Sequence, residues 1–219
     1  MTGVQTCALP ISPDFGRNEG ARFVIKIPRN ATLSRITTSN ASIRTQDGVG
    51  PARLKSGNGS IHVADFRGRL DAETSNSAIE LLNVEGDATA HSSNGHIHAD
   101  RLAGSFDAST SNGGIQASLA RADRSVRAET SNSSVELTFP AHFSSDVRVS
   151  TNNGGITLRL PESTNARVVA RTSNSSVTTD FSIRTQGEIS RNRLDGVIGT
   201  GGPLIDLSTS NGGIRLLQR

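Results

Sequence analysis

The stretch Thr110-Ser111-Asn112-Gly113-Gly114-Ile115 decides the fold, because near copies of it recur along almost the whole chain. The asparagines of these copies are Asn40, Asn58, Asn76, Asn94, Asn112, Asn132, Asn153, Asn174 and Asn211. The intervals between them are 18, 18, 18, 18, 20, 21, 21 and 37 residues, and the last interval indicates about two periods with one degenerate copy. A short constant period is typical of a solenoid, in which each coil buries its apolar face only against neighbouring coils.

Two short strands are predicted in each coil, because side chains alternate between the two faces of a strand. Three places after each asparagine the chain carries Ile or Val, the next residue is polar, and the one after that is mostly Val, Leu or Ala. Apolar residues also stand six and four places before the asparagine, as in Leu70 and Ala72. We therefore expect an all-β protein, a single-domain parallel β-solenoid (β-helix) of about nine to ten short coils with roughly 18 to 21 residues each.

The asparagine falls at the corner between the two strands of a coil. Asn and Gly tolerate positive φ, and a stacked Asn amide can hydrogen-bond to the coils on both sides. We expect the asparagines, and the Thr or Ser residues two places before them, to form stacked columns at this corner. Gly68, Gly86 and Gly104, ten places after their asparagines, predict the second corner.

The N-terminal part of the chain does not fit the repeat. Residues 1–12 resemble the translation of a short-read sequencing adapter, so we expect them to be foreign to the native protein and to add nothing to the fold. The native N-terminus, with any signal sequence or anchor, would then be missing. The apolar run within these residues is too short for a signal peptide or a membrane span. Residues 13–35 are predicted to form a lead-in strand or cap, and residues 36–219 the solenoid.

Composition excludes several classes of function. Cys7 is the only cysteine and lies in the adapter-like segment, which argues against disulfides, CxxC metal sites and thiol catalysis. The formal net charge is +3, the basic residues are spread along the chain, and Trp and Tyr are absent. A nucleic-acid groove is therefore not expected, since no basic cluster is interleaved with aromatic residues. Gly199-Thr200-Gly201-Gly202 lacks the lysine of a phosphate loop and indicates a turn.

Two outward columns are candidates for chemistry. His62, Glu80 and His98 occupy the same position in adjacent coils, about 4.8 Å apart, which is close enough for a metal or an acid/base pair. Cross-strand pairing of opposite charges explains such a column without a ligand. The column Asp71, Thr89, Asp107, Arg127 and Arg148 likewise indicates a solvated face more than a pair of catalytic carboxylates. We expect no catalytic, cofactor-binding or metal site, with His62, Glu80 and His98 as weak metal candidates.

The Thr-Ser-Asn-Gly-x-Ile repeats, the strand ends at Ile27-Pro28 and Leu160-Pro161, and the stretch from Leu194 to Gly202 together resemble the bacterial adhesin domain family, a β-helical repeat domain of unknown function. The similarity covers about residues 21–217. The resemblance implies a non-enzymatic protein of the bacterial cell envelope or surface, whose repeat face binds a protein partner or a glycan. It defines no catalytic residues and no cofactor.

Two alternatives remain open at this point. The first is a carbohydrate-active enzyme of the polysaccharide lyase or hydrolase type, which a pocket lined by clustered Asp, Glu or Arg would favour. The second is a structural spacer for a lost domain. Open coil ends also allow end-to-end self-association.

Overall fold

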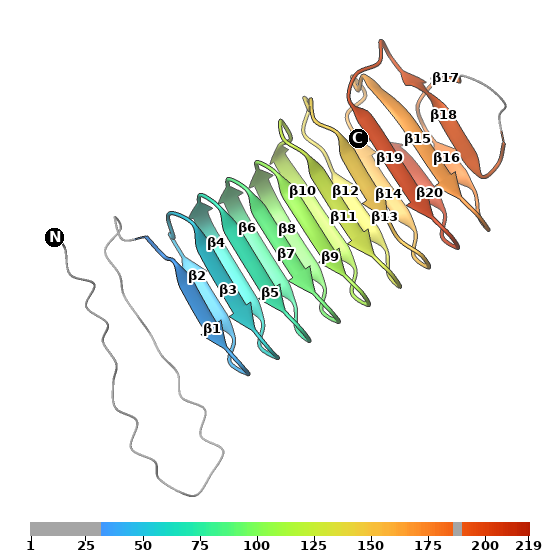
Figure 1. Cartoon of the computed structure of the whole chain (residues 1–219). Coiled ribbons are helices and arrows are strands. Elements are labelled where there is room, and N and C mark those ends of the chain that lie inside the picture. Colours follow the sequence, from blue (N-terminus) through green and yellow to red (C-terminus); the bar gives the residue numbers. More distant parts are fainter. Residues whose placement is uncertain (1–31, 186–189) are drawn as a thin grey trace, which may run out of the picture.

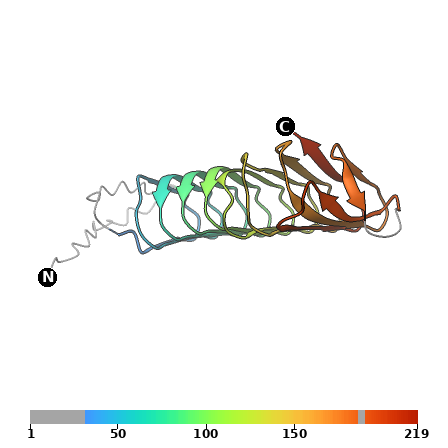
Figure 2. The same ribbon diagram turned by 90° about the horizontal axis from the view of Figure 1, so that it is seen from above.

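The computed structural model describes residues 32–185 and 190–219, which form an elongated stack of coils (Figure 1). The described elements are all strands, and the fold is a parallel β-solenoid with about seven turns in chain order, about 18 residues apart, so the coil count differs slightly from the sequence prediction. The expectations for residues 1–12, and for the lead-in before residue 32, lie outside the described part of the chain. Seen from above, the strands make two layers along the stack (Figure 2).

Each coil contributes one strand to each of two sheets. Sheet A has nine strands, in spatial order β2 (Ile43–Gln46), β4 (Ile61–Arg67), β6 (Ile79–Glu85), β8 (Ile97–Ala103), β10 (Ile115–Arg121), β12 (Val135–Thr138), β14 (Ile156–Leu160), β20 (Ile214–Gln218) and β16 (Val177–Thr179). Sheet B has eleven, in the order β1 (Arg35–Thr38), β3 (Ala52–Ser56), β5 (Leu70–Thr74), β7 (Ala88–Ser92), β9 (Phe106–Thr110), β11 (Val126–Thr130), β13 (Val147–Ser150), β19 (Leu204–Thr209), β15 (Ala166–Thr172), β18 (Arg193–Ile198) and β17 (Ile183–Thr185).

The core lies between the two sheets, where the apolar columns meet. Ile79, Ile97 and Ile115 pair in register on neighbouring strands and are each at most 2% exposed. On sheet B the columns that contain Leu70 and Ala72 are fully buried as well. β12 ends just before Phe139-Pro140, and β14 ends just before Pro161, because proline cannot donate to a ladder. The predicted phase of the strands is confirmed.

The asparagine corner forms the predicted stacked columns. Each Asn Nδ2 donates to the Asn Oδ1 of the preceding coil, as from Asn94 to Asn76 and from Asn112 to Asn94, both at 2.7 Å. The Thr or Ser hydroxyl two places earlier is buried and donates to a carbonyl of the neighbouring coil, as from Thr110 to Gly95 at 3.1 Å. An exposed amide ladder and a buried hydroxyl ladder therefore run side by side along this corner.

Positive φ angles occur at the other corner. Gly68, Gly86 and Gly104 have φ of 120°, 134° and 145°, which confirms the predicted glycine corner. The corner asparagines are not among the described residues with positive φ, so their expected left-handed conformation is wrong. Three residues before each of these glycines the left-handed positions are occupied by Asp65, Asn83 and Arg101, and by Asp47 in the coil before, with φ of 53° or 54°. Asp and Asn adopt this conformation more readily than most other residues.

The order of the last coils differs from the prediction of simple sequential stacking. Seven coils, from β1–β2 to β13–β14, follow one another in chain order. The next strands, β15 and β16, do not stack on β13 and β14. Instead β19 and β20, which come last in the chain, lie between them (Figure 1). We call β19–β20, residues 204–218, the inserted coil.

The 37-residue interval is thus an excursion and not a degenerate repeat. β18 pairs antiparallel with β15, and β17 pairs antiparallel with β18, so these strands cover the C-terminal edge of sheet B. Covering an edge with antiparallel strands interrupts the parallel coil pattern at that end. Strands β17 and β18, which precede the inserted coil in the chain, therefore form a cap at this end of the described solenoid.

Candidate functional site

The histidine column is arranged as the sequence predicts, but it gathers no metal ligands. His62 pairs with Glu80, and Glu80 with His98, in the parallel register of sheet A. His62 Nδ1 lies 2.7 Å from Glu80 Oε2, whereas His98 lies one strand further along and is exposed. Within residues 32–185 and 190–219, no group of three or more His, Cys, Asp or Glu side chains is placed to hold a metal ion. The geometry is that of a cross-strand polar pair on a solvated face.

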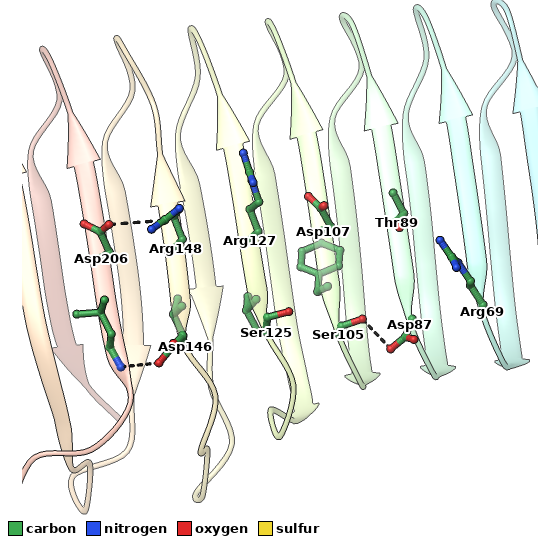
Figure 3. Close-up of a pocket in the computed structure, with 14 residues that line it drawn as sticks. Arg69, Asp87, Thr89, Ser105, Asp107, Ser125, Arg127, Asp146, Arg148 and Asp206 are labelled. Atoms are coloured by element: carbon green, nitrogen blue, oxygen red, sulfur yellow. Dashed lines mark hydrogen bonds and ion pairs between the residues drawn. The ribbon is translucent and has the colours of Figure 1, made fainter.

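The second column borders a groove on the outer face of sheet B (Figure 3). The groove has a volume of about 600 Å³. Phe106, Val126 and Val147, at the start of β9, β11 and β13, also border the groove, but each is 1% exposed and its side chain belongs to the core column of Leu70. Two rows of outward side chains line the groove, and both run along the solenoid axis.

The first row consists of the residues that immediately precede the sheet B strands, together with Leu204 at the start of β19, and the second row of the next outward residues along each strand. The first row contains Arg69, Asp87, Ser105, Ser125, Asp146 and Leu204, and the second contains Thr89, Asp107, Arg127, Arg148 and Asp206. Members of the second row pair in register from strand to strand, with Arg127 beside both Asp107 and Arg148. Neighbouring strands place these side chains about 4.8 Å apart.

Hydrogen bonds hold several of the acidic groups in place. Asp87 Oδ1 accepts from Ser105 Oγ at 2.7 Å and from Arg124 Nη1 at 2.8 Å. These two partners stabilise the carboxylate, the Ser105 hydrogen bond most strongly, and they lower the pKa of Asp87. Asp146 Oδ1 accepts the backbone N–H of Leu204 at 2.8 Å.

The two arginines of the second row each have one carboxylate partner. Arg148 Nε lies 3.6 Å from Asp206 Oδ2, and Arg127 Nη2 donates to Glu129 Oε1 at 2.8 Å. The Arg127 and Arg148 side chains are 51% and 63% exposed, so their guanidinium groups reach into solvent. Each guanidinium carries five N–H donors, and one carboxylate cannot occupy them all.

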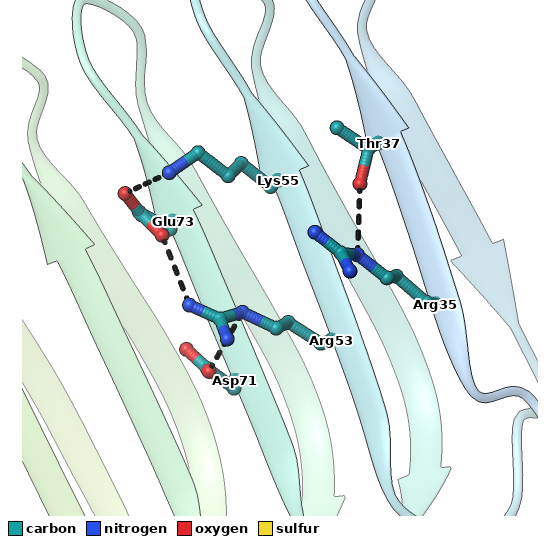
Figure 4. Close-up of polar contacts among 6 residues, drawn as sticks. All are labelled: Arg35, Thr37, Arg53, Lys55, Asp71 and Glu73. Carbon is teal, nitrogen blue, oxygen red and sulfur yellow. Dashed lines mark hydrogen bonds and ion pairs between the residues drawn. The ribbon is translucent and has the colours of Figure 1, made fainter.

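Beyond the groove, the same face of sheet B continues as a charged network (Figure 4). Arg53 lies between Asp71, at 3.4 Å, and Glu73, at 3.6 Å. Lys55 Nζ donates to Glu73 Oε1 at 2.6 Å, and this bond is the main cause of the lowered pKa of Glu73. Opposite charges thus alternate between neighbouring coils along this part of the face, as cross-strand pairing favours.

The sequence identified part of this groove and missed the rest. The predicted column of Thr89, Asp107, Arg127 and Arg148 is confirmed as one row of side chains, and Asp71 continues it on β5. Asp206 and Leu204 were missed because they reach the groove only through the insertion of β19 beside β13. Most of the first row could not be predicted because its residues precede the strands, and the alternation of inward and outward side chains applies within the strands.

Within the part of the chain that the structure describes, no helix is long and apolar enough to cross a bilayer. Comparison with known proteins gives no further assignment: no family model, no curated protein and no solved structure matches this chain.

Proposed function

We propose that the protein is a non-enzymatic, adhesin-like binding protein of a bacterial cell envelope, and that it binds a glycan chain in the sheet B groove. The observation that carries this proposal is the groove itself, with hydroxyl, carboxylate and guanidinium groups in two rows along the solenoid. Carboxylates accept hydrogen bonds from sugar hydroxyls, and guanidinium groups donate to hydroxyl and ring oxygens.

The spacing of the groups favours an extended ligand over a compact one. Five strands from β7 to β19 each contribute one residue to the second row, so the row repeats about every 4.8 Å over roughly 19 Å. A linear polymer that lies along the solenoid axis would meet equivalent groups at each step.

A carbohydrate-active enzyme is the second candidate, because carboxylates occur in both rows. Asp87 precedes β7 and Asp107 lies on the neighbouring β9, and likewise Asp146 precedes β13 and Asp206 lies on the neighbouring β19. Paired carboxylates about 6.5–9.5 Å apart can act in inverting glycosidases. Each of these pairs, however, includes one carboxylate already engaged by the protein. The pKa of Asp87 is lowered, whereas a general acid requires a raised pKa, and an oxygen of Asp146 accepts from Leu204. Binding without turnover is the better supported reading.

The test is a binding and turnover assay on a panel of neutral and acidic polysaccharides, by titration calorimetry together with analysis of released chain ends. The groove variant is Arg127→Gln with Arg148→Gln. The matched control is His98→Ala with Gln116→Ala, on the opposite sheet. We expect the groove variant to lose at least about tenfold in affinity for the polysaccharide that binds, and the control to bind as the unmodified protein does.

Three outcomes would decide against glycan binding in this groove. They are no binding to any polysaccharide, an equal loss in both variants, and release of new chain ends that Asp107→Asn abolishes. The last outcome would establish the enzyme. Thermal unfolding of both variants must match that of the unmodified protein, so that a loss of fold is not mistaken for a loss of contacts.

A further inference from the structure

The inserted coil is unusual because its place in the stack differs from its place in the chain. Its strands β19 and β20 pair on one side with β13 and β14 and on the other side with β15 and β16. The coil that contains β15 and β16 therefore meets the rest of the solenoid through residues that follow it in sequence. Until the inserted coil arrives, an open slot one coil wide separates β13–β14 from β15–β16.

The slot is built to receive a coil of this repeat. Ile205, Leu207, Ile214 and Leu216 of the inserted coil are fully buried and continue the apolar columns of the core. Asn211 Nδ2 donates to Asn153 Oδ1 at 2.7 Å, and Asn174 Nδ2 donates to Asn211 Oδ1 at 2.6 Å, so the amide ladder also passes through it. Thr209 and Thr172 extend the hydroxyl ladder in the same way.

The connection to the inserted coil is short and contains several glycines. Residues 199–203 lead from β18 around the start of β15 to β19, with Gly199 at φ 60° and Gly201 at φ 84°. Asn165 Oδ1 holds this connection by accepting from the backbone N–H of Thr200 at 2.8 Å and from its hydroxyl at 3.0 Å.

From these observations we infer that the inserted coil is exchanged between two copies of the chain, so that residues 204–218 of one copy fill the slot of the other. Both copies offer the same slot and the same coil, so the contacts between the inserted coil and the slot are reproduced in the exchanged dimer, while the connection takes a different path. The five connecting residues span at most roughly 17 Å when extended, which requires the C-terminal ends of the two copies to lie close together. Short hinge connections invite this kind of exchange.

Exchange would make the groove a shared site. Leu204 and Asp206 line the groove and belong to the inserted coil, whereas the other lining residues belong to β5 to β13 and the turns before them. In the exchanged dimer each groove takes Leu204 and Asp206 from the second copy. The inference about exchange does not depend on which ligand the groove binds.

The test uses the full chain with Cys7→Ser and one introduced cysteine in each of two variants, Ser150→Cys and Ser208→Cys. Ser150 and Ser208 face outward and pair in register between β13 and β19. The strand spacing of about 4.8 Å falls within the range of Cα separations that a disulfide accepts. The two variants, one of them tagged, are unfolded together, refolded at high protein concentration and oxidised.

We expect a covalent dimer that contains both variants, with the bond mapped by mass spectrometry to positions 150 and 208. The control mixes His91→Cys with Ser109→Cys, which pair in register between coils that follow one another in the chain, and it should give little mixed dimer. Light scattering on the unmodified protein after the same refolding should show a dimer fraction that rises with concentration. A purely monomeric unmodified protein, or equal amounts of mixed dimer from both pairs, would overturn the inference.

Discussion

Successive residues of one strand lie alternately in the core and in solvent, so substitutions at neighbouring positions should have very different effects on stability. Ile97 is 1% exposed and lies between Ile79 and Ile115, while its neighbour His98 points into solvent. Ile97→Ala should lower the free energy of unfolding by about 2–5 kcal/mol because it leaves a cavity between two coils. His98→Ala should lower it by less than about 0.5 kcal/mol. Denaturant titration of both variants measures the contrast, and equal losses would mean that the histidine column has a structural role.

The two glycine positions after a corner asparagine differ in how much room they leave for a side chain. The first position, as at Gly95, has no room for a Cβ, and the second, as at Gly114, has almost enough. A Cβ on Gly95 would fall well inside van der Waals distance of the Ser77 carbonyl oxygen, whereas a Cβ on Gly114 would meet its nearest atom, Ser134 O, at 3.3 Å. Gly95→Ala should therefore cost about 1–3 kcal/mol and Gly114→Ala about 0.5 kcal/mol or less. Thermal unfolding provides the comparison. If Gly95→Ala were neutral, the corner could adopt the arrangement of coils that carry Ser at this position.

The charged network at Glu73 predicts a dependence of stability on pH. The Lys55 hydrogen bond is the main cause that holds the pKa of Glu73 below its usual value of 4.5 in the folded protein. A lowered folded pKa means that the stabilisation is present above about pH 4.5 and is lost as the pH falls through the folded value. Because the side chain is 34% exposed, solvent screening keeps the contribution below about 1 kcal/mol.

Glu73→Gln should therefore lower stability at pH 7, and lower it by less at pH 3. Unfolding midpoints in denaturant at the two pH values measure the difference. Lys55→Met should reproduce most of the effect at pH 7, and adding Glu73→Gln to it should cost little more. A loss of equal size at both pH values would show that Glu73 contributes through packing and not through charge.

Among the strands and corners, the sequence period predicted the features that every coil shares, and it could not predict features that occur in one place only. Ile97, Leu70 and Asn94 could be placed because each belongs to a column with the same residue type in most coils. Arg101 could not be recognised as a left-handed corner residue, since arginine rarely takes that conformation and only the Asp and Asn residues of its column hint at it. The cap β17–β18 has no counterpart elsewhere in the chain, so no column existed from which to infer it.

The contribution of the amide ladder to stability can be measured by comparing an asparagine at its end with one in its middle. Asn94 makes two amide bonds in the ladder, to Asn76 and Asn112, while Asn40 makes one described bond, to Asn58. A net contribution of about 0.5–1.5 kcal/mol for each bond predicts that Asn94→Ala costs roughly twice as much as Asn40→Ala. Equal costs, measured by denaturant unfolding, would show that the ladder bonds add little and that the backbone holds the corner.

For the whole molecule, the solenoid behaves as a row of coils whose stability is approximately a sum of coil terms and neighbour terms. The groove illustrates what this architecture does for function, because its second row draws one residue from each of five neighbouring strands. Sequence spacing located four of these residues, Thr89, Asp107, Arg127 and Arg148. The fifth, Asp206, required knowledge of the stacking order, which no local pattern carries because any coil of the repeat could in principle stack on any other.

The stacking order of the last coils predicts which strands open together when a core residue is truncated. Leu207 of the inserted coil and Leu137 of β12 are both fully buried, so Leu207→Ala and Leu137→Ala should each cost about 2–5 kcal/mol. Their effects on local opening should differ.

β15 pairs with β19 on one side and with the cap strand β18 on the other, so weakening the inserted coil should release β15 and β18 together, although β15 precedes Leu207 by more than one period. Native-state hydrogen exchange should show faster exchange in β15, β18 and β19 for Leu207→Ala, with β5 to β9 unchanged. The Leu137→Ala control should weaken β10 to β14 first. If β15 kept its protection in Leu207→Ala, β15 would be held by contacts other than those with the inserted coil, and the slot would not open as one unit.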